Sequence, residues 1–325
     1  MTFSNKKLLA GVVCGALFSG CGGGAGDTTP IAADPVTPAM GNISFSITDG
    51  PRADTRAMVL HITGMELGHS NGDVITLDMP NGAMSVDMMQ LQNGVHASLV
   101  TGVDIPTGHY DWVRLHIDLS QSYVELSGTG GQHGMHMGGD ATNGLEVHEP
   151  FELLDGMNHE FMLEFDLQRG VQHHDMGMMG EEYELHSAMR LVDMEHAGGL
   201  SGMIDASMID INHPDCDQEP GGNWAYLFPG DATVPDDVAA SDTDGIPGPI
   251  TTDRVEMDPA TGDHNYHFGY LPEGSYRIAF TCSGEWDEFG DDDYPADPDG
   301  RFDFQMFSNP MDVVAGQMGS HDMMP

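Results

Sequence analysis

Alternation of apolar and polar residues is the dominant pattern along this chain. The clearest case is residues 160–168, where one face would carry Phe161, Leu163, Phe165 and Leu167 and the other Met162, Glu164, Asp166 and Gln168. A period of two places successive side chains on opposite faces of a strand. The segment is therefore predicted to be a half-buried β-strand.

Similar alternation or short apolar runs predict strands along most of the chain. The first group is 43–48, 57–67, 74–79, 109–119, 122–126, 160–168 and 183–193. The second group is 203–211, 224–228, 252–257, 266–270, 276–282, 302–307 and 311–314. Apart from one short helical turn near 88–91, no segment shows a sustained helical period. The fold class is predicted to be all-β, with two β-sandwich-like domains.

A glycine-containing break at 196–200 separates the two groups of strands. We therefore predict one domain over 41–195 and a second over 199–325. The links 229–249 and 284–300 are long, acidic and rich in Pro and Gly, which is typical of surface loops.

The N-terminus has the layout of an export signal. Lys6 and Lys7 precede an apolar run over 8–18 that is too short to remain as a membrane-spanning helix. The run ends in LFSGC at 17–21, which resembles the lipobox of bacterial lipoproteins. The resemblance implies a signal peptide over 1–20, cleavage before Cys21 and lipid on that cysteine; an ordinary signal peptide with an incidental cysteine is the alternative.

The expected location is the cell envelope. Residues 21–40 contain prolines at 30, 35 and 38 and no apolar period, so a flexible tether is predicted behind the lipid. Gly22 rather than aspartate follows Cys21. By resemblance to lipoprotein sorting in Gram-negative bacteria, this favours the outer membrane.

The charge balance excludes several partners. The chain has 52 acidic residues and a net charge of −42. Both of its lysines precede Cys21, which leaves eight arginines in the predicted mature protein. Such a polyanion repels nucleic acid and anionic lipid surfaces, and salt or divalent cations should stabilise it. A solvated acidic surface and a dedicated cation store are the two interpretations.

Two cysteines remain for other roles after Cys14 leaves with the signal peptide and Cys21 takes lipid. These are Cys216 and Cys282. An even pair in an oxidising compartment favours a disulfide over a catalytic thiol.

Three stretches carry a family resemblance. They are 46–51 (SITDGP) with 58–63 (MVLHIT), 86–91 (VDMMQL) with 105–110 (IPTGHY) and 113–115 (VRL), and 163–167 (LEFDL) with Tyr183 and 189–192 (MRLV). Together they span about residues 41 to 195. This region resembles the bacterial domain-of-unknown-function family numbered 4382, found in exported proteins, for which no catalytic residues can be carried over.

The second region carries a different resemblance. Residues 199–202 (GLSG) and 266–276 (YHFGYLPEGSY) are similar to carboxypeptidase-regulatory or transthyretin-like β-sandwiches. Some members of that broad fold bind carbohydrate, but no residue here matches a defined sugar site. A glycan-binding or adhesive role is therefore a fold-level analogy.

Motifs typical of enzymes are missing from the sequence. It has no G-x-S-x-G elbow, no H-E-x-x-H string and no G-K-[ST] phosphate loop. His148-Glu149 and His159-Glu160 begin a zincin-like string, but the second histidine is absent in both places. We expect a protein that is not an enzyme.

Two segments are rich in histidine and methionine. Their candidate metal ligands are His133, Met135, His136 and Met137 in the first, and His173, His174, Met176, Met178 and Met179 in the second. Both are expected in Gly-rich links between strands, where soft thioethers and imidazoles suit copper, Cu(I) above all. The alternative is a pair of solvated loops in a chain that uses methionine freely.

The acidic segment 291–300 is a second candidate cation site. Asp291, Asp293, Asp297 and Asp299 precede a glycine and suit Ca²⁺, although the EF-hand spacing is not met. A solvated run of charge is the alternative.

These observations predict a cell-envelope lipoprotein with a non-enzymatic binding or structural role. Its expected partners are the membrane, through lipid on Cys21, and a metal ion, a glycan or an envelope protein. A copper-binding protein using the His/Met segments and a carbohydrate-binding or adhesive module are the alternatives.

Overall fold

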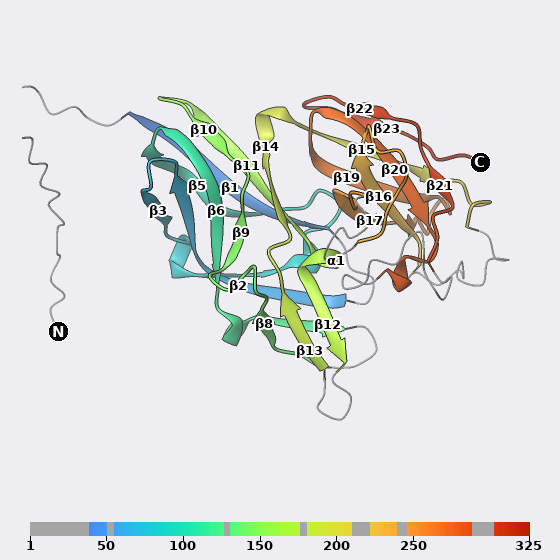
Figure 1. The fold of residues 1–325 in the computed structure, drawn as a ribbon, viewed down its shortest axis with the longest axis horizontal. Coiled ribbons are helices and arrows are strands. Elements are labelled where there is room, and N and C mark those ends of the chain that lie inside the picture. The colour runs from blue at the N-terminus through green and yellow to red at the C-terminus, as the bar shows by residue number, and fades with distance from the viewer. Residues whose placement is uncertain are drawn as a thin grey trace, which may run out of the picture. The chain divides into compact units, whose positions relative to one another are not determined.

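The computed structural model describes residues 39–50, 55–126, 131–175, 181–209, 222–238, 246–287 and 302–325 (Figure 1). Pro38–Pro325 form one compact unit. No helix in these described ranges is long and apolar enough to cross a membrane. We refer to residues 39–193 as the N-terminal half and to residues 197–325 as the C-terminal half.

The N-terminal half contains a four-stranded sheet with the strand order β14-β11-β1-β5. The strands are β1 (Met40–Gly50), β5 (Ala97–Pro106), β11 (Asn158–Asp166) and β14 (Met189–Asp193). β1 and β11 run parallel, whereas the other two pairs are antiparallel. The parallel pair brings the carboxyl ends of two distant segments to the same edge of the sheet.

The second sheet of this half has seven antiparallel strands. The order β10-β6-β2-β3 is extended by β4 and β7, which pair with β2, and by β9, which pairs with β6. Their bounds are β2 (Thr55–His69), β3 (Val74–Leu77), β4 (Met84–Asp87), β6 (Gly108–Ile117), β7 (Tyr123–Leu126), β9 (Leu145–Val147) and β10 (Phe151–Leu153). One apolar core lies between the two sheets; in it, Phe45 of β1 packs against Phe151 of β10.

A small third sheet has the order β12-β13-β8 and lies beside α1 (Leu167–Gly170), as Figure 1 shows. Its strands are β8 (Met135–Met137), β12 (Val171–Asp175) and β13 (Glu181–Leu185). Short 3-10 helices occur at Pro80–Gly82, Met88–Gln90, Leu119–Gln121, Met194–His196 and Gly284–Trp286.

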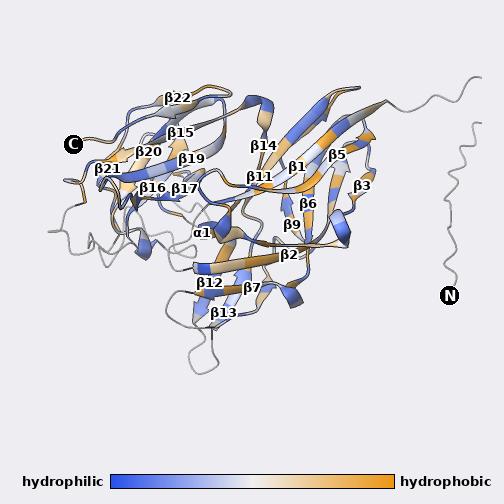
Figure 2. Cartoon of the chain, turned by 180° about the vertical axis from the view of Figure 1, so that it is seen from behind, coloured by the Kyte–Doolittle hydropathy of each residue, from blue (hydrophilic) through white to orange (hydrophobic). Residues whose placement is uncertain are grey.

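The C-terminal half contains two further sheets. One has the order β18-β19-β15-β23; the other has the order β17-β16-β20-β21, with β22 also paired to β20. The strands are β15 (Ala197–Ile204), β16 (Trp224–Pro229), β17 (Thr251–Arg254), β18 (Glu256–Met257), β19 (His264–Pro272), β20 (Gly274–Thr281), β21 (Met306–Phe307), β22 (Met311–Val313) and β23 (Met318–Ser320). Apolar residues of both sheets share one core, and Figure 2 shows apolar colouring concentrated over β16, β20 and β21.

The predicted all-β fold class is confirmed, and most predicted strands are present with shifted ends. The predicted strand 183–193 is instead two strands, β13 and β14, in different sheets. The helical turn expected near 88–91 is present as the 3-10 helix Met88–Gln90, whose N-cap Asp87 accepts a hydrogen bond from Met89 N. The division at residues 196–200 into separate domains stays a prediction, because Pro38–Pro325 form a single compact unit.

Candidate functional site: an acidic junction between the two halves

The polar face of β11 does not lie in solvent, contrary to the half-buried strand predicted for residues 160–168. Glu164 is 7% exposed and Asp166 is 6% exposed, and Met162 on the same face is buried as well. Their burial places two carboxylates inside the molecule. Gln168 also departs from the prediction, since it belongs to α1 and its amide donates to the Asp287 carbonyl (2.8 Å).

Hydrogen bonds between the two halves cover this face. The Thr251 hydroxyl of β17 donates to Glu164 Oε1 at 2.8 Å. Arg190 of β14 pairs with Glu164 and donates to the Tyr270 carbonyl of β19 at 3.0 Å. Glu164 is therefore a polar link between strands of both halves.

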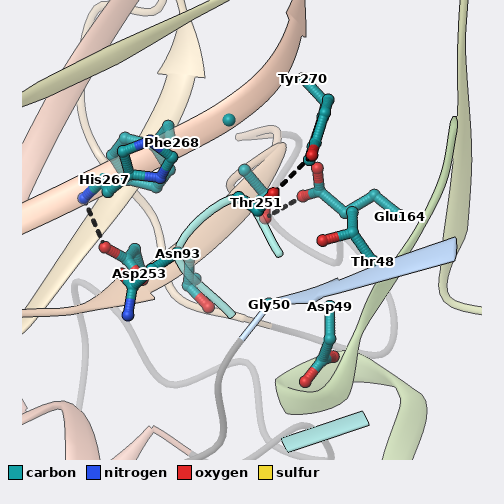
Figure 3. A pocket seen from close by; sticks show the side chains of 13 residues that line it. Thr48, Asp49, Gly50, Asn93, Glu164, Thr251, Asp253, His267, Phe268 and Tyr270 are labelled. Atoms are coloured by element: carbon teal, nitrogen blue, oxygen red, sulfur yellow. Dashed lines mark hydrogen bonds between the residues drawn. The ribbon is translucent and has the colours of Figure 1, made fainter. Parts of the chain in front are cut away.

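The parallel pairing of β1 with β11 places Asp49 at the same end of the sheet, but on its other face. Thr48 is in register with Glu164, Asp49 with Phe165, and Gly50 with Asp166. Since registered residues of parallel strands share a face, Thr48 lies on the side of Glu164 and Asp49 on the other. Figure 3 shows the Asp49 carboxylate pointing away from Thr48 and Glu164.

A small cavity of about 20 Å³ opens at this junction. Its lining includes Thr48, Asp49, Glu164, Thr251, Thr252, Asp253, His267 and Tyr270 (Figure 3). A space of this size holds about one water molecule or one ion. It is far smaller than the several hundred Å³ that organic ligands need, which makes a sugar or a metabolite an unsuitable occupant.

Asp49 is the least satisfied side chain of this site. It is 7% exposed, and neither of its carboxylate oxygens has a hydrogen-bond partner. Burial raises the pKa of Asp49 well above its ordinary value of 3.8. The negative charges of Asp166, Glu164 and Asp87 raise it further, in that order.

Asp166 is only partly satisfied. Its Oδ1 caps α1 by accepting from the backbone N–H groups of Gln168 (3.0 Å) and Arg169 (3.3 Å), but its Oδ2 is buried without a partner. Burial raises the pKa of Asp166 to about 6, although the nearby Arg169 charge and the cap hydrogen bond to Arg169 oppose the shift.

Two more carboxylates of the C-terminal half are buried nearby. Asp253 accepts from the His267 backbone N–H at 2.6 Å, and burial raises its pKa to about 8. Asp287 accepts from the Tyr226 hydroxyl at 2.6 Å, and burial raises its pKa to about 7. The charge of Asp166 contributes to the raised pKa of Asp287, which links the two carboxylates electrostatically.

A second cavity, of about 290 Å³, shares Glu164 and also contains Asp166, Arg169 and Arg190 in its lining. Both arginines already have partners, since Arg169 Nη1 donates to the Pro249 carbonyl (3.2 Å) and Arg190 pairs with Glu164. Their guanidinium groups are used to hold the two halves together rather than to offer an open anion site.

Five of the predicted metal ligands, Met135, His136, Met137, His173 and His174, lie on strands of one small sheet rather than in links. β8 and β12 lie on either side of β13, with Tyr183 opposite both Met135 and His173. Met135 is 8% exposed in the core, and Met137 packs against the same core. The expectation that these two methionines are exposed in a loop is wrong, because they pack as ordinary core residues.

The other histidines and methionines of these segments have different surroundings. His133 and His173 lie against the Tyr183 ring, with ring centroids 5.2 and 4.9 Å from it. His136 and His174 approach Glu184 instead. Met176, Met178 and Met179 lie outside the described residues.

Several other predicted sites also lie outside the described residues. These are Cys21, Cys216, Asp291, Asp293, Asp297 and Asp299. Cys282 is described and is fully buried just after β20. Its pairing with Cys216 and the calcium site of the acidic segment remain predictions.

The sequence reasoning missed Asp49, Asp166, Asp253 and Asp287 as functional residues. Asp49 and Asp166 do lie within two of the stretches, 46–51 and 163–167, that carry the family resemblance. Nothing in their local pattern marks them as buried. In the described part of the chain, no three His, Cys, Asp or Glu side chains are arranged to hold a metal ion by themselves.

The fold and this site define an all-β protein with buried carboxylates between its halves. Residues 40–186 match the family described as "Domain of unknown function (DUF4382)". This confirms the resemblance predicted for the N-terminal region over most of its length. No curated protein matches the chain.

Solved structures give only remote similarities. The Bacillus anthracis TIE protein is 11% identical, with 88% of this chain and 33% of that chain covered and a TM-score of 0.18. A leucine-rich repeat protein from Bacteroides thetaiotaomicron is 10% identical, with 88% and 26% covered and a TM-score of 0.20. A fimbrial protein from Bacteroides ovatus is 8% identical, with 88% and 49% covered and a TM-score of 0.19. The chain spans about a third and about a quarter of the first two proteins, and scores this low support no argument about its function.

Proposed function

We propose that this chain is a lipid-anchored, non-enzymatic protein of the cell envelope whose acidic junction binds a divalent cation, for which Ca²⁺ is the best match. The cation would hold the two halves in the arrangement that a binding or structural role requires. The single observation that carries the cation site is the buried Asp49 carboxylate, both of whose oxygens lack a partner and whose pKa is raised further by the charges of Asp166 and Glu164.

The physical argument rests on what can satisfy Asp49. A buried carboxylate without a partner is costly when ionised, and when protonated it still needs an acceptor for its O–H group. Asp49 has neither kind of partner. A divalent cation would neutralise the charge of Asp49 and offset its repulsion by Asp166 and Glu164. Protonation of Asp49 alone would leave Asp166 and Glu164 without a ligand.

Calcium suits this site better than other common ions. Ca²⁺ takes six to eight oxygen ligands in flexible geometry and accepts backbone carbonyls, hydroxyls and water beside carboxylates. That tolerance matters because no three acidic or imidazole side chains of the described residues converge by themselves. The cavity of about 20 Å³ has room for one ion, and its lining is rich in oxygen atoms.

The envelope part of the proposal is supported by the sequence. The LFSGC stretch at 17–21, the tether that follows and the resemblance of the N-terminal region to a family of exported proteins agree with one another. We also propose the division into domains 41–195 and 199–325, since separate apolar cores occupy the two halves. Outer-membrane attachment through Cys21 is part of the same proposal.

The test is thermal unfolding of the purified full-length protein in detergent at pH 7.5, with excess EDTA and then with CaCl₂. At a free calcium concentration about 100 times Kd, binding stabilises by about 2.7 kcal/mol. For a protein of this size that raises Tm by about 5–10 °C. Asp49→Asn should remain folded, gain no Tm from calcium and lose the calcium heat in titration calorimetry.

The matched control is Asp78→Asn, which removes one aspartate that is exposed to solvent. It should respond to calcium as the wild-type protein does. Equal calcium responses of Asp49→Asn and wild type would exclude this site, and so would a wild-type Tm that calcium leaves unchanged. Repeating the titration with MgCl₂ tests ion preference, because Mg²⁺ demands near-octahedral geometry and should bind more weakly.

A further inference from the structure

The sheet formed by β8, β13 and β12 separates the ligand types of the two His/Met segments. Successive side chains of a strand point to opposite faces, so His136 is on the other face from Met135 and Met137. Those two methionines pack against the core. His136 therefore lies on the solvent face, without the described thioethers.

Glu184 and His174 lie on that same outer face. Glu184 is in register with His136 across the parallel pair β13–β8. His174 is in register with Glu182 across the antiparallel pair β12–β13, which places it diagonally opposite Glu184. Strand pairing thus brings two imidazoles from opposite sides to one carboxylate.

The distances between these side chains suit the binding of one shared metal ion. Glu184 Oε2 lies 3.7 Å from His136 Nε2 and 3.5 Å from His174 Nε2. Zinc binds imidazole nitrogen and carboxylate oxygen at about 2.0–2.2 Å, so two ligands of one ion can be up to about 4 Å apart. Both pairs of atoms fall within that limit.

The side chains have the freedom to complete a site. His136 is 44% exposed and His174 is 39% exposed, so their rings can turn about their side-chain torsions without disturbing the core. This adjustment is required, because no three His, Cys, Asp or Glu side chains of the described residues are already arranged around a position for a metal ion. Glu182, whose Oε1 is 3.6 Å from His136 Nδ1, is available as a fourth ligand or as a carboxylate that orients the ring.

We propose that His136, His174 and Glu184 bind a divalent transition-metal ion, Zn²⁺ or Cu²⁺. Two imidazoles with a carboxylate are a borderline donor set that suits these ions; Cu(I) prefers thioethers and Ca²⁺ prefers oxygen ligands. The site uses other strands than the proposed calcium site does, so each can fail without the other.

The alternative is that the two histidines serve as ordinary surface partners of glutamate. Exposed ion pairs of this kind contribute little to stability. Two other histidines of the described residues provide a matched control: His148 Nε2 lies 2.9 Å from Glu146 Oε1, and His196 Nδ1 lies 3.7 Å from Glu273 Oε1. Each approaches a glutamate without a second histidine recorded at the same oxygen.

The experiment is competition for Zn²⁺ against a chromophoric chelator at pH 7.5, with the full-length protein in detergent. The variant His136→Gln/His174→Gln is compared with the control His148→Gln/His196→Gln. The first variant should bind one Zn²⁺ fewer than wild type, or bind it at least about 10-fold more weakly, and the control should match wild type. Glu184→Gln should weaken binding while both histidines remain.

Two readouts separate a specific site from general attraction to an acidic surface. Affinity should fall as the pH is lowered from 7.5 to 5.5, because imidazole must be neutral to bind a metal. Co²⁺ in place of Zn²⁺ should give visible absorption bands that are absent from the first variant and present in the control. Equal Zn²⁺ binding by all three proteins, or equal losses in the two double variants, would overturn the proposal.

Discussion

Replacing Asp253 with Asn should reduce the dependence of stability on pH. Asp253 is 6% exposed, and burial raises its pKa from 3.8 to about 8 in the folded protein. Between these two pH values the folded chain keeps a proton that the unfolded chain has released. Raising the pH therefore favours the unfolded chain, and calcium-free protein should lose stability from about pH 4 to about pH 8.

The magnitude follows from proton linkage. Each such group lowers the free energy of unfolding by about 1.4 kcal/mol per pH unit within its window. Asp166 has a pKa of about 6 and Asp287 has a pKa of about 7. Each therefore contributes to the loss of stability with rising pH only below its own pKa. Between pH 7 and pH 8, Asp253 is therefore a main source of the slope.

Asp253→Asn keeps an oxygen that can accept from the His267 N–H but removes the titration. Because Asp253 is already half ionised at pH 8, the loss of stability between pH 7 and pH 8 should decrease by about 1 kcal/mol, which corresponds to about 2–4 °C in Tm. Urea denaturation in EDTA at half-unit steps from pH 5 to pH 8.5 measures it, with Asp78→Asn as the exposed control. A wild-type stability that is constant or rises over this range would show that the carboxylates are not protonated in the folded protein.

Three further outcomes are expected. Cys21→Ser should leave an uncleaved or soluble precursor in cell fractionation, and a processed, membrane-bound variant would contradict lipid attachment at that residue. Cys216 and Cys282 should both resist alkylation in the denatured, unreduced protein; a disulfide closing this loop would stabilise by about 4 kcal/mol. Gly202→Ala should destabilise by about 1–3 kcal/mol in urea, because a Cβ there would lie 1.7 Å from the His321 carbonyl oxygen of the chain beside β15; unchanged stability would contradict that close approach.

Local sequence pattern predicted many of the strands, but it did not predict which strands pair with one another. Residues 43–48, 109–119 and 224–228 were recognised because each presents a two-residue period or a short apolar run, and they became β1, β6 and β16. The ten-residue strand β5 was missed. Other missed strands, such as β8 and β23, have only three residues each and contain glycine or histidine. A segment of three residues forms a strand only because a neighbouring strand supplies its hydrogen bonds. The local sequence pattern does not show which segment that neighbour will be.

The His/Met segments show how the same limit applies to chemistry. Composition indicated that imidazole and thioether donors lie close together, but it did not reveal the faces on which they lie. Residues 135–137 form a strand, in which successive side chains point to opposite faces. Met135 therefore lies in the core and His136 lies on the solvent side. A proposal for Cu(I) that combined both donors at these positions is thereby replaced by a proposal for Zn²⁺ or Cu²⁺ on one face.

The acidic junction could not be predicted from the sequence for a related reason. Alternation along 160–168 correctly separates the two faces of β11, but it cannot tell whether the face with Glu164 and Asp166 meets water or protein. That outcome depends on strands of the C-terminal half and on the parallel pairing that brings Asp49 alongside. Burying like charges at a junction is unfavourable unless a proton or a cation accompanies them. The association of the two halves should therefore be coupled to whichever of these binds, with protons favoured at low pH and a cation at higher pH.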